Sequence, residues 1–111
     1  MKIAVTIERA DTNSAIDPHF GRCAWFCIVD TTDNSRALTD NSGGAAASHG
    51  AGIQAVQTIA EKGVEILVTG QLGPKATNAL KAAGIRAYAM TDGTVDDALT
   101  KLQNEQLKRI A

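Results

Sequence analysis

The side chains best suited to binding or catalysis lie in two short segments, each just before a predicted strand or helix. Asp17–Cys23 reads DPHFGRC and combines an imidazole, a guanidinium and a thiol. Ser48–Gly52 reads SHGAG and adds a second imidazole at a glycine-rich helix start. Imidazole and thiolate suit transition metals, whereas a guanidinium and the free N–H groups of a helix start bind anions. The sequence therefore predicts a site for an anion, a metal or both.

Each of these features also has a purely structural interpretation. The stretch GGAAASHGAG at residues 43–52 is typical of a flexible loop that leads into a helix. His19 and His49, taken singly, resemble ordinary solvated loop histidines. Arg22 is equally consistent with an ion pair to Asp17 at the start of a strand. The pairing of such residues across two loops is what favours a binding site.

The two cysteines are predicted to differ in role. If both lie on one strand, four residues at about 3.3 Å each place them ~13 Å apart, too far for a disulfide or a shared metal ion. Cys23 borders the first loop, so it is the candidate ligand and is expected to react faster with a thiol reagent. Cys27 lies between Trp25 and Val29 and is predicted to be a small core residue.

Periodicity predicts the elements that must position these segments. Alternating or continuous apolar runs predict strands at residues 2–7, 24–30, 35–40, 64–69 and 85–89. Helical spacing, with Pro74 in a first turn and Thr94 as an N-cap, predicts helices that begin near residues 52, 74 and 95. Residues 103–111 are expected to fray. The order β-β-β-α-β-α-β-α indicates an α/β fold with a mixed five-stranded sheet covered by helices.

Composition limits the classes of function. The chain has 111 residues, 44% of them hydrophobic, which suits one domain with one core. No apolar run reaches the ~18 residues of a membrane helix, and the first residues read as a strand instead of a secretory signal. We therefore expect a cytoplasmic protein that does not bind a membrane. A formal net charge of -1 with scattered basic residues gives no field for a phosphate backbone, so nucleic acid is not an expected partner.

The motifs and their order resemble the dinitrogenase iron-molybdenum cofactor biosynthesis family, the NifX/NafY-like proteins. The points of similarity are four segments in a fixed order: His19–Arg22, Asp40–Asn41, Gly50–Ile53 and Gly73–Ala76. The resemblance covers residues 1–105 as a single cofactor-binding domain and leaves residues 106–111 as a short C-terminal tail. It implies a three-layer, ribonuclease-H-like fold that has no nuclease activity.

The resemblance also implies a function. Members of this family bind or carry cofactor precursors that contain molybdenum, iron and sulfur, and small stand-alone members called orange proteins hold a molybdenum-copper sulfide cluster. Cofactor-assembly or cell-division-related proteins are the implied protein partners, and catalysis is not expected. Because such clusters are anions, we expect binding mainly by electrostatics and backbone N–H groups, with His19, Cys23 and His49 as the candidate metal ligands. The predicted cofactor-binding residues come from the two segments: His19, Phe20, Gly21, Arg22, Cys23, Ser48, His49, Gly50, Ala51 and Gly52.

Other functions compete with this one. Gly50–Ala55 satisfies the nucleotide-binding pattern G-x-G-x-x-A, but it follows the third strand across a long loop, and Leu72 stands where an acidic ribose partner is expected. A metal-dependent nuclease would need carboxylates on the first strand, which reads KIAVTI. A regulatory or partner-binding domain with a vestigial cluster site stays open.

Overall fold

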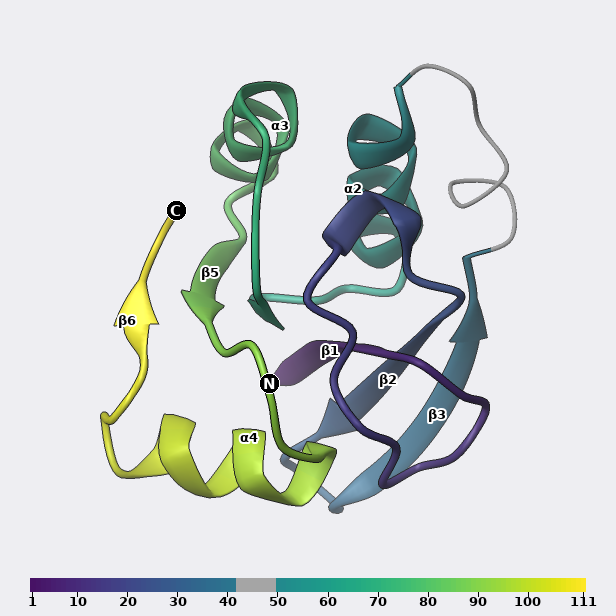
Figure 1. Ribbon diagram of the computed structural model, residues 1–111, viewed down its shortest axis with the longest axis vertical. Helices are drawn as coiled ribbons and strands as arrows, with labels where there is room; N and C mark the ends of the chain where they lie inside the picture. Colours follow the sequence, from purple (N-terminus) through teal and green to yellow (C-terminus); the bar gives the residue numbers. More distant parts are fainter. Residues whose placement is uncertain (42–49) are drawn as a thin grey trace.

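A mixed β-sheet with the strand order β3-β2-β1-β4-β5-β6 forms the centre of the molecule (Figure 1). The computed structural model describes residues 1–41 and 50–111. The strands within that part of the chain are β1 (Lys2–Ile7), β2 (Trp25–Asp30), β3 (Ser35–Asp40), β4 (Ile66–Thr69), β5 (Arg86–Ala89) and β6 (Lys108–Arg109). The helical elements are a 3-10 turn η1 (Phe20–Arg22) and the helices α2 (Ala51–Glu61), α3 (Pro74–Ala83) and α4 (Val95–Gln103).

Strand direction determines which loops meet. β1, β4 and β5 pair in parallel, while β2 is antiparallel to both of its neighbours β1 and β3. As a result β1, β3, β4 and β5 all run the same way, and the segments that follow them leave the sheet on the same side, where the carboxyl ends of these four strands lie. We call this side, formed by the strand ends, the carboxyl edge; ligands of open α/β sheets usually bind there.

The sheet separates two hydrophobic clusters. Phe26 and Ile28 of β2 point into a cluster that contains side chains of α2 and α3. Cys27 and Val29, the alternate residues of the same strand, point into a second cluster that contains side chains of α4. All four residues of β4 are buried, as expected for a parallel strand with both faces covered. The layers are therefore α2 and α3, the sheet, and α4 (Figure 1).

The end of the chain differs from the sequence prediction. Instead of fraying, residues 108–109 form β6, which pairs antiparallel with β5 and makes the sheet six-stranded instead of five-stranded. The Ile110 N–H donates to the Ala87 carbonyl at 2.8 Å, and Ile110 and Ala111 pack against the cluster under α2 and α3. Both residues of β6 are exposed, so its sequence carries no hydrophobic period that could have indicated a strand.

The other elements lie close to their predicted positions. β1 and β3 have the predicted bounds, while β2, β4 and β5 begin one or two residues later than predicted. The helices begin at residues 51, 74 and 95, against predictions of 52, 74 and 95. Across the described residues, no helix is long and apolar enough to cross a membrane.

Candidate anion-binding site

The loop after β1 is fixed to the carboxyl edge by backbone contacts. The Gln71 N–H donates to the Pro18 carbonyl at 2.8 Å, which joins this loop to the end of β4. At Gly70 an added Cβ would lie 2.4 Å from the Pro18 Cβ, so a side chain there would push the two segments apart. A glycine at position 70 thus allows the loop to pack directly on β4.

The η1 turn carries the middle of the DPHFGRC motif. Phe20 is buried and packs against Phe26 with ring centroids 6.0 Å apart, which anchors the turn in the core. The Arg22 N–H donates to the His19 carbonyl at 3.2 Å and closes the turn. A Cβ on Gly21 would lie 2.8 Å from the backbone nitrogen of Gly52, so the turn lies against the first turn of α2.

Two helices begin beside η1. Gly50 precedes α2 with φ of 70°, a left-handed conformation that glycine adopts without steric cost. Gly73 precedes α3 and Pro74 is its first residue. A Cβ on Gly52 would lie 3.0 Å from the Ala76 Cβ, so the first turns of α2 and α3 are in close contact. The positive ends of two helix dipoles therefore lie side by side.

The start of α4 shows how this protein caps a helix with its own side chains. The Thr94 hydroxyl accepts from the Asp97 N–H, the Asp97 carboxylate accepts from the Thr94 N–H, and Asp96 and Asp97 occupy the first turn. Within the described chain, no side chain caps α2 or α3, and neither helix has an acidic residue in its first turn. The side chains that the structure describes thus leave the first N–H groups of both helices unoccupied, and such groups can bind an anion.

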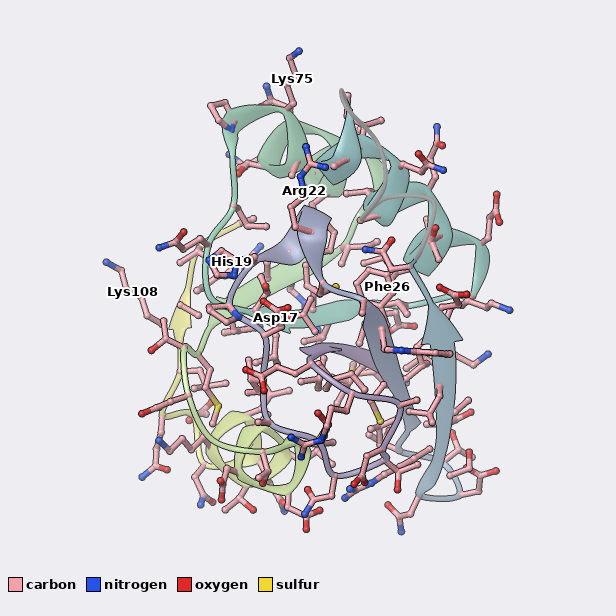
Figure 2. All side chains as sticks on the ribbon, turned by 45° about the vertical axis from the view of Figure 1, so that its right-hand side comes forward. Asp17, His19, Arg22, Phe26, Lys75 and Lys108 are labelled. Carbon is pink, nitrogen blue, oxygen red and sulfur yellow. The ribbon has the colours of Figure 1, made fainter. Side chains whose placement is uncertain are left out.

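A depression of about 470 Å³ opens between these elements. We call it the helix-start depression; its lining consists of Phe20, Gly21, Arg22, Gly50, Ala51, Gly52, Ile53, Gln71, Gly73, Pro74, Lys75 and Ala76. Arg22 and Lys75 are basic, and none of these lining residues is acidic. Figure 2 shows Arg22 on η1 and Lys75 at the start of α3 at the same end of the molecule, far from Lys108. The local charge therefore favours an anion.

The sequence of the whole chain is similar to that of known proteins. The family model for the dinitrogenase iron-molybdenum cofactor matches residues 1–105. The chain belongs to this family. An uncharacterized protein of Methanocaldococcus jannaschii is 30% identical over 112 residues, which cover 98% of this chain and 91% of that protein.

Two solved structures extend the comparison. The apo form of the orange protein from Desulfovibrio gigas is 40% identical with a TM-score of 0.94, over 99% of this chain and 92% of that one. A Thermotoga protein, described as a candidate NifB protein and solved by NMR, is 31% identical with a TM-score of 0.85, over 97% and 91% of the two chains. The family, the mixed α/β architecture and the main associations with the iron-molybdenum cofactor thus agree with the resemblance drawn from the motifs.

His19 does not line the helix-start depression of this family member. Its backbone pairs with Gln71, which does line it, but its side chain is 65% exposed. The His19 Nδ1 lies 3.0 Å from an oxygen of Asp17, and the same oxygen accepts from the His19 N–H. Asp17 therefore orients the imidazole at the rim of the depression.

Cys23 differs from its predicted environment. It is fully buried in the cluster under α2 and α3, and its Sγ donates to the Phe20 carbonyl at 3.2 Å. Burial, with a smaller contribution from the charge of Asp17, raises the pKa of the Cys23 thiol to about 12. The expectation that Cys23 is the accessible thiol at a loop is wrong, because η1 turns the chain inward before β2 begins at Trp25. Burial and a high pKa both oppose a thiolate ligand at this position.

Cys27 is buried in the opposite cluster, as predicted for a core residue. Burial raises the pKa of its thiol as well. The two cysteines are free and lie on opposite faces of the sheet, which agrees with the prediction that they do not form a chelating pair.

The remaining predicted residues divide into two groups. Five residues named from the sequence line the depression together with Arg22: Phe20, Gly21, Gly50, Ala51 and Gly52. Ser48 and His49 lie outside the described residues. Over residues 1–41 and 50–111, no group of three or more His, Cys, Asp or Glu side chains is placed to hold a metal ion.

The contribution of α3 to the depression was not predicted from the sequence. Lys75, Gln71 and the start of α3 form one wall of the depression. Two signals could have indicated this wall. Gly73–Ala76 was already one of the four family-like segments, and the parallel direction of β1 and β4 brings the segments that follow them to the same edge of the sheet.

Proposed function

We propose that this protein binds or carries an anionic molybdenum-containing metal-sulfide cluster, or a precursor of one, in the helix-start depression. The main support is the meeting of two helix starts, uncapped by described side chains, with Arg22 and Lys75 in one depression. Each helix end and each cation favours negative charge. Membership of the iron-molybdenum cofactor family and the likeness to the orange protein support a metal-sulfide cargo.

The proposed binding mode is electrostatic, with backbone N–H groups as the principal donors. Sulfides of a thiomolybdate-type cluster carry the negative charge, so donors and cations can hold them without a covalent bond to the metal. The candidate ligands support this choice. Cys23 is buried as a protonated thiol, and His19 lies at the rim with its Nδ1 on Asp17.

A carrier role follows from the same features. A cluster held by charge and hydrogen bonds can be released without breaking metal–ligand bonds, which suits transfer to another protein. We propose no reaction at this site and place the protein in the cytoplasm, with cofactor-assembly or cell-division-related proteins as its partners. We also propose that the fold is of the ribonuclease-H-like type.

Reconstitution tests this proposal. Protein purified anaerobically is mixed with tetrathiomolybdate, alone and with copper(I) or iron(II), then desalted, and the bound metal and visible spectrum are measured. We expect the natural chain to retain molybdenum, and retention to fall as salt screens the attraction. Lack of retention under every condition would refute the proposal.

Single substitutions distinguish charge from ligation. Arg22→Ala is expected to be the most damaging and Lys75→Ala the next, each weakening binding about tenfold, which corresponds to ~1.4 kcal/mol. Lys108→Ala removes the same charge far from the depression and should bind normally. Full retention by Arg22→Ala, together with complete loss in His19→Ala, His49→Ala or Cys23→Ala, would show direct ligation instead.

A further inference from the structure

Asn41 is a buried polar residue directly after β3, with 2% of its surface exposed. Its side-chain Nδ2 donates to the Cys23 carbonyl at 2.8 Å and makes a longer contact of 3.5 Å with the Gly21 carbonyl. Its backbone N–H donates to the Ala24 carbonyl at 2.9 Å. One residue thus contacts three carbonyls in η1 and the segment that joins it to β2, those of Gly21, Cys23 and Ala24.

The orientation of the Asn41 amide follows from these contacts. Carbonyl oxygens only accept hydrogen bonds, so the NH2 group must face Gly21 and Cys23 and the amide oxygen must face away. That oxygen, Oδ1, is buried without a hydrogen-bond partner among the residues that the structure describes. The donor side of the amide, which faces Gly21 and Cys23, is therefore the side whose contacts the described structure shows.

What the NH2 group holds is the backbone on both sides of Arg22. The two carbonyls that it contacts belong to the residues before and after Arg22. The Gly21 backbone is in close contact with the first turn of α2, and Arg22 itself lines the helix-start depression. A shift of this backbone would move the guanidinium of Arg22 relative to both helix starts.

We propose that Asn41 is a positioning residue for anion binding, which holds the η1 backbone so that Arg22 faces the starts of α2 and α3. This inference rests on the proposed function, because it concerns the same depression. It assigns to Asn41 no contact with the ligand. The effect of Asn41 on binding must therefore depend on Arg22.

A double-mutant cycle with tetrathiomolybdate as the probe tests this dependence. Dissociation constants are measured at low temperature, where circular dichroism shows each variant folded, for the natural chain, Asn41→Ala, Arg22→Ala and the double variant. We expect Asn41→Ala to weaken binding about tenfold, corresponding to the ~1.4 kcal/mol of one well-placed hydrogen bond. In the Arg22→Ala background the same change should alter the dissociation constant less than twofold.

Two further variants separate positioning from stability. Thr94→Ala removes the cap of α4 and should lower the melting temperature without changing the dissociation constant. Asn41→Ser keeps one donor, so it should bind between the natural chain and Asn41→Ala, and it replaces Asn41→Ala in the cycle if that variant does not fold.

The outcomes distinguish the two proposals. Failure of the natural chain to bind tetrathiomolybdate would overturn the proposed function and this inference with it. Normal binding by Asn41→Ala, or an equal loss in both backgrounds, would overturn the role of Asn41 and leave the proposed function standing.

Discussion

Gly73 offers a substitution that should change stability and binding in opposite directions. It precedes α3 with φ of -79° and ψ of 167°, a conformation that any residue can adopt at an N-cap. A Cβ there would meet no described atom within 4 Å. In Gly73→Asp the new carboxylate can accept from the first N–H groups of α3, at Lys75 or Ala76. Those are the donors that we assign to the anionic ligand.

The expected gain in stability is about 1 kcal/mol. An Asp cap is worth a few tenths of a kcal/mol over glycine, the helix dipole adds about 0.3–1, and the loss of glycine freedom in the unfolded chain adds a similar amount. A chain of 111 residues has an unfolding entropy of about 0.23 kcal/mol per kelvin, so the melting temperature should rise by about 4 °C.

The expected loss in affinity is larger. A unit charge about 5 Å from a bound anion, at an effective dielectric constant of about 20, opposes binding by roughly 3 kcal/mol, or about two orders of magnitude in the dissociation constant. Thermal unfolding by circular dichroism and titration with tetrathiomolybdate in low salt measure the two effects. Lys108→Ala changes the net charge by the same amount and serves as the control.

The paired result is what makes this experiment decisive. A stabilised Gly73→Asp protein that binds tetrathiomolybdate as well as the natural chain would refute the involvement of α3. A weakened affinity that Lys108→Ala reproduces would show that only the net charge matters.

Three further substitutions or conditions test other parts of the structure. Gly21→Ala should cost roughly 1–3 kcal/mol in calorimetry and also weaken binding, because its Cβ would press on α2; unchanged stability would show that this contact is loose. Burial raises the pKa of the Cys23 thiol to about 12 from its ordinary value near 9, so the folded protein keeps this proton after the unfolded chain has lost it. The free energy of unfolding should therefore fall with rising pH between those values, by up to roughly 1.4 kcal/mol per pH unit, and Cys23→Ala should flatten a urea-denaturation series across that range. Removing residues 108–111 should cost about 2 kcal/mol in a urea titration through the lost strand pairing and Ile110 contacts, with binding unchanged; an equally stable truncated chain would mean that β6 adds nothing.

The sequence predicts those parts of the fold whose signal is local. β1 and β3 and the starts of α3 and α4 follow from alternation, from Pro74 and from the Thr94 cap, which act within a few residues. β6 could not be predicted, because its two exposed residues owe their conformation to pairing with β5, about twenty residues earlier in the chain. Strand pairing across such a distance leaves no period in the sequence.

The residues of the candidate site also divide into those with a local sequence signal and those whose position depends on distant parts of the chain. Gly21, Arg22 and Gly50–Gly52 were identifiable because glycines before a helix and a nearby guanidinium are local chemistry. The burial of Cys23 was not identifiable, since it depends on the 3-10 turn η1, which directs the chain into the core before β2 begins. Lys75 was missed because its place beside Arg22 depends on the order of the strands in the sheet.

The close contact between Gly52 and Ala76 has a thermodynamic consequence for the fold. It brings two like partial charges together at the starts of α2 and α3, so the empty fold contains a repulsion that a bound anion offsets. Under the proposed function, an anion that binds in the depression, sulfate or phosphate from a buffer included, shifts the equilibrium toward the folded state by RT ln(1 + [L]/Kd). We therefore expect the melting temperature to rise with the free anion concentration, so that thermal unfolding reports the occupancy of the site.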